Sequence, residues 1–194
     1  MSTETIRVAS VAADRWPDLA RVFGERGDQA GCWCQWFKLS AADYRAESRD
    51  AKQERLHEQV ATSASPGVIA WLGDEPVGWS AVEPYDAYPV LARSTITKRL
   101  AGDPVDRVWS VTCFVVRRDY RRRGVARELL AGAVEHARAG GASAVEGYPV
   151  DPGVRPALTP AERYHGTVSL FETAGFVVVR RPSATRAIMR LELS

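Results

Sequence analysis

Short runs of alternating or continuous apolar residues predict β-strands along the chain. The runs cover residues 6–11, 68–72, 77–82, 108–116, 143–148, 176–179 and 187–193. The turn Gly73-Asp74-Glu75-Pro76 separates the second run from the third, so these two predict an antiparallel hairpin. Residues 108–116 are mostly apolar, which is typical of a buried strand, and we expect them to form the central strand.

Apolar residues at helical spacing predict helices between these strands. The clearest helix spans residues 124–139 and ends at Gly140-Gly141. Because it lies between two predicted strands, it should form a right-handed parallel crossover. Shorter helices are expected after Asp14, a candidate N-cap, and over residues 167–174. The remaining segments are a charged surface region at 43–62 and two long loops, at 83–106 and 149–163. The loop at 83–106 contains a predicted short helix near residues 90–100.

Composition and charge narrow the classes of protein that the chain can belong to. We expect the 194 residues to form one domain, residues 1–194. With 26 basic and 24 acidic side chains, the net charge of +2 gives no argument for a nucleic acid or membrane partner. We see neither a basic and apolar leader nor an apolar run that would span a bilayer, so we expect a cytoplasmic protein. The three cysteines argue against a disulfide framework.

Residues 31–37 are dense in aromatic side chains and include two cysteines, Cys32 and Cys34. Two cysteines at this spacing could supply two metal ligands, but no second pair completes the set, and His57 stands alone on a charged helix. We therefore expect no metal. The favoured interpretation is an aromatic plug that packs under the sheet.

A basic turn follows the central strand and leads into the long helix. It contains three consecutive arginines directly before Gly124. The unpaired backbone N–H groups of a helix N-terminus carry partial positive charge and suit a phosphate. The arginines add like charge to this end, a conflict that a bound polyanion would remove. Alternatively, the arginines are exposed, cost roughly tenths of a kcal/mol and only solubilise the turn; these residues alone do not decide between the two.

The turn resembles the first signature of the GNAT acetyltransferase superfamily, which is Arg or Gln, two residues, Gly, one residue, then Gly or Ala. It is also placed as in that family, between an apolar strand and an amphipathic helix. The resemblance implies acetyl-CoA as cosubstrate. Its pyrophosphate would lie on backbone N–H groups of the turn, and its pantetheine arm would bond the strand Phe114, Val115 and Val116. The matching turn residues are Arg121, Arg122, Arg123, Gly124, Val125 and Ala126.

Residues 170–176, which end in Gly-Phe, resemble the second signature of the same family. The resemblance covers the C-terminal part of the chain well, while the N-terminal third matches mainly in the order of elements. It implies an α/β fold with a mixed, mostly antiparallel central sheet, one parallel pair of strands that splay apart, and helices on both faces. The cofactor arm would lie between the splayed strands, and residues 31–37 would also wall the acceptor pocket.

Transfer of an acetyl group to an amine requires a group that removes the amine proton. Glu83 is the first candidate for this base, because it ends the third predicted strand, beside the acceptor site that the resemblance implies. Asp86 is the second candidate. The alternative is that Glu83 is a solvated carboxylate at a strand end. Backbone N–H groups of residues 114–116 would polarise the thioester carbonyl.

Many family members carry a tyrosine four residues before the glycine of the second signature, where it protonates the leaving thiolate. This chain has Phe171 there, and phenylalanine cannot donate a proton. Tyr164, at a position where the family frequently has an asparagine, is the candidate acid, with packing as its alternative role. The acid is also dispensable, since an alkyl thiol with a pKa of about 8.5 leaves tolerably as thiolate. Cys113 has no histidine beside it in the sequence and is interpreted as core.

The leading hypothesis is an N-acetyltransferase that moves the acetyl group from acetyl-CoA directly to a primary amine. The acceptor is either a small molecule or a protein lysine. A non-catalytic acyl-CoA-binding or sensor domain is the alternative, because the usual tyrosine is missing. Nucleic-acid binding through residues 117–123 is weaker, since Tyr120 is the one aromatic residue in this basic cluster. The oligomeric state stays open, with a homodimer among the candidates.

Overall fold

The computed structural model describes residues 5–25, 31–62, 65–101, 107–153 and 163–193. Its strands form one seven-stranded sheet in the order β1-β2-β3-β4-β5-β7-β6. Among the described strands, β4 and β5 are the parallel pair and the other neighbours are antiparallel, which confirms the predicted mixed sheet. The strands are β1 Ile6–Ser10, β2 Gly67–Leu72, β3 Glu75–Pro84, β4 Val108–Val116, β5 Ala144–Gly147, β6 Val177–Ser183 and β7 Arg186–Glu192.

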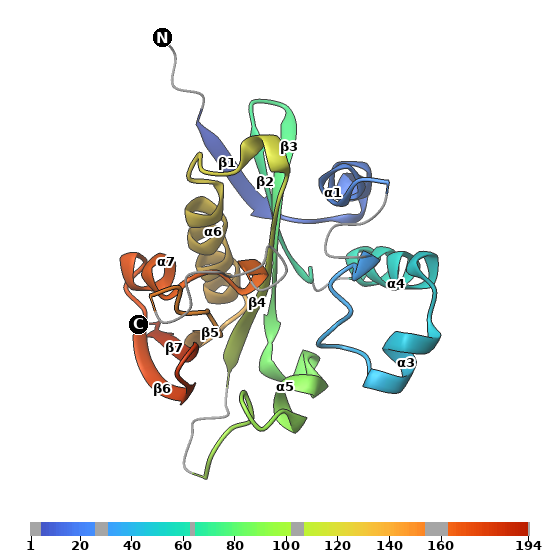
Figure 1. The fold of residues 1–194 in the computed structure, drawn as a ribbon. Helices are drawn as coiled ribbons and strands as arrows, with labels where there is room; N and C mark the ends of the chain where they lie inside the picture. Colours follow the sequence, from blue (N-terminus) through green and yellow to red (C-terminus); the bar gives the residue numbers. More distant parts are fainter. Residues whose placement is uncertain (1–4, 26–30, 63–64, 102–106, 154–162, 194) are drawn as a thin grey trace.

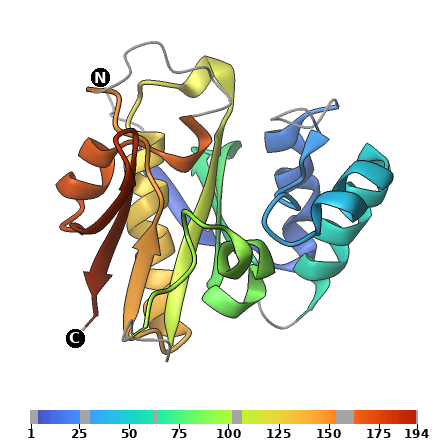
Figure 2. The same cartoon turned by 60° about the horizontal axis from the view of Figure 1, so that its bottom comes forward.

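Helices cover both faces of this sheet (Figure 1). On one face lie α6 (Val125–Ala139) and α7 (Val168–Thr173). On the other lie α1 (Trp16–Phe23), α3 (Ala41–Ala46) and α4 (Arg49–Ala61), a group well separated from β6 and β7 in Figure 2. The short helix α5 (Pro89–Arg93) follows β3. The described 3-10 turns are η1 Ala13–Arg15, η2 Tyr85–Ala87, η3 Arg118–Tyr120 and η4 Arg163–His165.

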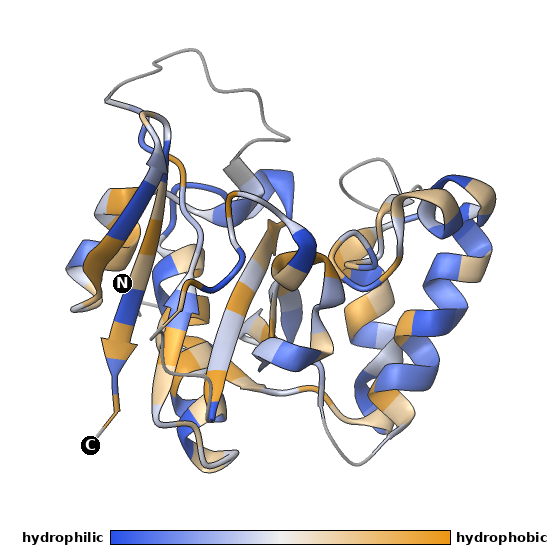
Figure 3. Cartoon of the chain, turned by 90° about the horizontal axis from the view of Figure 1, so that it is seen from below, coloured by the Kyte–Doolittle hydropathy of each residue, from blue (hydrophilic) through white to orange (hydrophobic). Residues whose placement is uncertain are grey.

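Serine side chains divide the charged region 43–62 into two helices. Ser40 accepts a hydrogen bond from the N–H of Asp43 at 3.1 Å, and Ser48 accepts one from the N–H of Ala51 at 3.1 Å. Each serine therefore satisfies one backbone donor at the start of its helix. The predicted cap at Asp14 is wrong, because Asp14 lies inside η1 and the positions before η1 and α1 make no side-chain cap bond. Figure 3 shows many hydrophilic residues on the helices α3 and α4.

Two apolar layers hold the sheet between its helices. On one side α6 packs closely, since a Cβ added at Gly132 would lie 2.3 Å from Val8 of β1. This confirms the close packing for which a glycine is needed there. On the other side Trp33, Trp71 and Trp79 are buried, so the predicted aromatic plug exists, although Trp36 of the same segment is 50% exposed. These indole rings pack with apolar residues of α1 and α4, while α3 contributes no buried residue.

Each of the three cysteines is a free thiol. Cys113 is buried in the core, as predicted, and Trp79 Nε1 donates to Cys34 Sγ at 3.2 Å. Burial, with a contribution from neighbouring Cys34, raises the pKa of Cys32 to about 11. The part of the chain that the structure describes contains no group of three His, Cys, Asp or Glu side chains that could hold a metal. None of the described helices has the length and apolar character needed to cross a bilayer.

Candidate active site

The turn between β4 and α6 presents backbone N–H groups that have no partner in the part of the chain that the structure describes. Arg122 and Gly124 both have left-handed backbone conformations, with φ of 61° and 82°. Within the described residues, the N–H groups of residues 122–126 make no hydrogen bond. A turn of this kind can bring successive N–H groups into an anion-binding concavity, and the helix dipole adds to the attraction. The backbone of this turn therefore has the geometry that an anion site requires.

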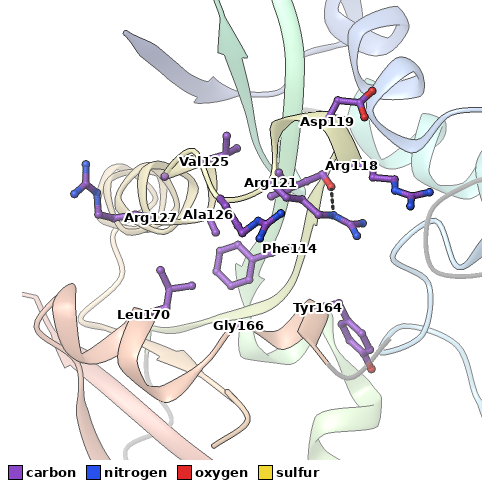
Figure 4. Close-up of a pocket in the computed structure, with 13 residues that line it drawn as sticks. Phe114, Arg118, Asp119, Arg121, Val125, Ala126, Arg127, Tyr164, Gly166 and Leu170 are labelled. Atoms are coloured by element: carbon purple, nitrogen blue, oxygen red, sulfur yellow. Dashed lines mark hydrogen bonds between the residues drawn. The ribbon is translucent and has the colours of Figure 1, made fainter. Parts of the chain in front are cut away.

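A cavity of about 890 Å³ opens beside this turn (Figure 4). Tyr164, Gly166 and Leu170 line it from the side opposite to the turn. Its volume is in the range of sites that hold a cofactor or a drug-sized ligand. The predicted cofactor residues in its lining are Phe114, Val116, Arg121, Arg122, Gly124, Val125 and Ala126.

Two of the predicted cofactor residues, Val115 and Arg123, do not belong to this lining. Val115 is buried in the layer that contains Trp79, because successive strand residues point to opposite faces of a sheet. The guanidinium of Arg123 lies 5.3 Å from the centroid of the Tyr120 ring. At Val115 the backbone alone is left for a contact with a ligand.

Arginine side chains make the lining of the cavity basic. Arg118, Arg121, Arg122 and Arg127 belong to it, with Asp119 as the acid among the lining residues. The Nε of Arg121 donates to the Val116 carbonyl at 3.0 Å, shown as a dashed line in Figure 4. Because charge-assisted bonds between guanidinium and phosphate are strong, this lining favours a polyanion.

The cavity lies beside the point where β4 and β5 separate. Their parallel register runs from Val108 opposite Ala144 to Val111 opposite Gly147, and it is not continued by the described residues beyond that pair. A shift in the register of β3 and β4 falls at the same place, between the partners of Ala81 and Val82. The backbone of β4 after Val111 is therefore released from β5, as expected for the splayed pair.

Phe171 is a core residue and does not reach the site. It is fully buried, and a Cβ added at Gly147 would lie 2.1 Å from its ring. It also packs edge-on against Phe114 and Phe176, with ring centroids 6.1 Å and 5.0 Å away. The missing tyrosine is thus replaced by a residue whose surroundings are apolar.

Tyr164, the candidate acid, lines the cavity, and its hydroxyl points away from the turn in Figure 4. It lies in η4 and its ring is partly buried. Burial, followed by the neighbouring Cys113 thiol, raises the pKa of this hydroxyl above its usual value. The hydroxyl therefore keeps its proton at neutral pH and remains a donor.

Glu83 is not part of the cavity lining, so the structure does not bring the two predicted catalytic residues together there. Its Oε2 lies 2.5 Å from Lys38 Nζ, and its side chain is only 15% exposed. The interpretation of Glu83 as a solvated surface group is therefore wrong. Burial raises the pKa of this carboxyl, and the Lys38 charge opposes that effect. Asp86, the second candidate base, is exposed.

The sequence analysis missed His165, which is buried next to Tyr164. Its Nδ1 lies 3.1 Å from the Thr112 carbonyl oxygen of β4, and its ring centroid lies 4.0 Å from that of Tyr164. Burial, together with the nearby Arg186 charge, lowers the pKa of His165 to about 3. In the sequence, the one indication of a role for His165 was its position next to Tyr164.

We expect acid to destabilise the protein through His165. The folded-state pKa of about 3 lies below the unfolded value of about 6.5. The contribution is complete above pH 6.5 and is lost as the pH falls toward the folded-state pKa, because only the unfolded chain takes up the proton; the slope is about 1.4 kcal/mol per pH unit. Urea unfolding at pH 7, 6 and 5 should show a shallower pH slope for His165→Asn than for the wild type. Equal slopes would contradict the assignment.

Comparison with known families assigns the chain. The sequence matches the family model described as Acetyltransferase (GNAT) family over residues 33–166, which is more than half of the chain. The chain belongs to the GNAT family. This match begins within the aromatic segment 31–37 and ends at Gly166, which lines the cavity. It therefore includes the turn at Gly124 and the strands β4 and β5. Comparison with curated protein sequences gave no match.

Solved structures of GNAT proteins share the fold. A GCN5-related N-acetyltransferase from Kribbella flavida has a TM-score of 0.56 and 17% identity, covering 99% of this chain and 100% of that one. The PaiA N-acetyltransferase from Thermoplasma acidophilum, in complex with coenzyme A, has a TM-score of 0.53 and 13% identity. This likeness covers 97% of this chain and 99% of that one. The putative acetyltransferase yncA from Salmonella typhimurium, with its cofactor acetyl-CoA, has a TM-score of 0.55 and 11% identity. This likeness covers 97% of this chain and 94% of that one. At these identities the likeness concerns the fold alone.

Proposed function

We propose that this GNAT protein is an N-acetyltransferase that moves an acetyl group from acetyl-CoA directly to a primary amine. The observation that carries the proposal is the row of unbonded N–H groups at residues 122–126, at one end of a basic cavity. Family membership supports the transferase activity. The coenzyme A and acetyl-CoA complexes of two structural relatives support the choice of cosubstrate.

The proposed path of the cosubstrate follows β4. The diphosphate lies on the turn, the pantetheine arm runs along Phe114 and Val116, and the thioester reaches the region where β4 leaves β5. There, β4 backbone N–H groups polarise the thioester carbonyl, and these donors become more effective as negative charge develops on its oxygen. The amine lone pair forms the C–N bond, and the C–S bond then breaks to release the thiolate.

Tyr164 is the proposed donor of a proton to the leaving thiolate. We expect Tyr164→Phe to lower kcat by about tenfold to a hundredfold, at or below the lower bound for general acids because a thiolate is a tolerable leaving group. The change in melting temperature on adding CoA should be the same as in the wild type. An unchanged kcat for Tyr164→Phe would exclude the role.

Glu83 is the proposed carboxylate of the acceptor side, but it would act on an amine only after its bond to Lys38 opens. The acceptor is a small-molecule amine or a protein lysine. We further propose a cytoplasmic protein without nucleic acid or membrane partners.

The function is tested by incubating the protein with acetyl-CoA and a panel of amines, for example 2-phenylethylamine, spermidine and an Nα-acetyl-lysine ester, while free thiol is followed. We expect amine-dependent thiol release, and a rise in melting temperature on adding CoA because CoA binds only the folded protein. No thermal shift at millimolar CoA would sink the proposal. The buried Phe171 in place of a tyrosine favours the second candidate, a non-catalytic acyl-CoA sensor, which predicts the thermal shift without thiol release for any amine.

A further inference from the structure

The tautomer of His165 follows from its bond to β4. A backbone carbonyl only accepts hydrogen bonds, so Nδ1 must carry the proton that it donates to Thr112, at 3.1 Å. In the neutral ring, Nε2 then holds a lone pair. Among the described residues this nitrogen has no hydrogen-bond partner, although His165 is only 6% exposed. A buried histidine thus offers an unused acceptor.

His165 is not itself a lining residue of the cavity, but the structure holds it directly beside the lining. His165 lies in the chain between Tyr164 and Gly166, which both line the cavity. Thr112, to which it bonds, directly follows Val111, the last residue of β4 that pairs with β5. The imidazole is therefore fixed at the point where the two strands separate and where the thioester of the proposed cosubstrate would end.

The groups around the ring keep it neutral. Arg186 places a positive charge nearby, and Phe37 and Tyr164 contribute ring contacts at centroid distances of 5.5 Å and 4.0 Å. Together with burial, the Arg186 charge holds the pKa of the imidazole at about 3. The imidazole is therefore neutral across the whole neutral range of pH, and its Nε2 is a weak base that takes a proton only from a strongly acidic donor.

We propose that Nε2 of His165, and not Glu83, which is paired with Lys38, accepts the proton of the attacking amine, an inference that rests on the function proposed above. When the amine lone pair forms the C–N bond, the nitrogen bonded to the tetrahedral carbon becomes a much stronger acid than a free ammonium ion. The C–S bond breaks with its electron pair on sulfur, and the proton moves from nitrogen to Nε2. It passes on to the thiolate, directly or through Tyr164, which restores the neutral imidazole. No other reactant is consumed.

His165→Asn tests this role, because the amide of asparagine can still donate to the Thr112 carbonyl but has no group at the position of Nε2. With the best acceptor of the amine panel, we expect kcat to fall by about a hundredfold, the lower bound for loss of a general base. The KM for acetyl-CoA and the thermal shift with CoA should not change. His136→Asn is the matched control, since both ring nitrogens of His136 are already bonded, to Ser10 and Ser65, and its activity should equal that of the wild type.

A second measurement does not depend on the variant. Nitrogen-15 NMR of the wild-type protein should show His165 with a protonated Nδ1 and an unprotonated Nε2 from pH 8 to pH 5. The opposite tautomer, or wild-type kcat in His165→Asn, would overturn the assignment. Thiol release that is absent in the wild type with every amine would refute the proposed function itself, and the role of His165 with it.

Discussion

Gly124→Val is expected to abolish the rise in melting temperature that CoA produces, while the protein still folds. Gly124 has φ of +82°, and a Cβ added there would meet no atom within 4 Å, so the new side chain would enter the open space beside the N–H groups. Two effects then act against binding. A left-handed conformation costs a residue with a Cβ about 1–2 kcal/mol, and a branched side chain holds the phosphate away from the backbone. Together we expect CoA to bind at least about a hundredfold more weakly, roughly 2.7 kcal/mol.

Gly141→Val separates strain from lost binding. Gly141 has φ of +81°, has no atom within 4 Å of an added Cβ, and lies beyond the opposite end of α6. The strain of the two substitutions should therefore be similar, and both should lower the stability of the free protein. The thermal shift with CoA should survive in Gly141→Val alone. If Gly124→Val binds CoA like the wild type, the turn is not the site.

Glu146→Ala should destabilise the fold by about 3–5 kcal/mol, as expected when one partner of a buried ion pair is removed. Its carboxylate, only 4% exposed, accepts bonds from Arg190 at 2.6 and 2.9 Å and from Arg99 at 3.4 and 3.5 Å. Both arginine side chains are nearly buried, at 11% and 12% exposure. Removing the carboxylate leaves two enclosed cations without the anion between them. Urea unfolding at pH 7 measures the loss.

Glu192→Ala is the control for this prediction. Glu192 also lies near Arg190, at 3.8 Å, but its side chain is 73% exposed, so we expect a change within about 0.5 kcal/mol. A loss below about 1 kcal/mol for Glu146→Ala would show that water reaches the cluster. The ion pairs of Glu146 are also linked to the central strand β4. The Tyr148 hydroxyl donates to Glu146 and lies 2.9 Å from the hydroxyl of Ser110 in β4.

The parts of this protein that the sequence predicts well are those set by local chemistry. The turn at Gly124 is an example. An apolar strand, a residue type that tolerates positive φ and a helical pattern follow one another within a few positions, so the chain itself dictates that N–H groups gather at the start of α6. Gly132 is another case. A glycine inside a helix indicated that another segment approaches α6 closely, and in the structure Val8 of β1 is that segment.

The parts that it predicts poorly depend on which distant segments meet. For Glu83 the sequence offered a catalytic base or a solvated strand end but not an ion pair, because nothing near it in the chain reveals that Lys38 packs against it. His165 looked ordinary because its partner is a carbonyl of β4, and every residue has a carbonyl. The side chain of Arg123 turns to Tyr120 although the signature treats it like its neighbours. Side-chain partners of this kind are settled by tertiary packing, not by spacing along the sequence.

Titration of the isotopically labelled protein with CoA, followed by the backbone amide signals, tests the central claim most directly. If the diphosphate is bound by main-chain donors, the largest shifts should fall on the amides of residues 122–126, and Gly124→Val should remove them. Saturable binding of CoA that leaves these amides unchanged would contradict the account.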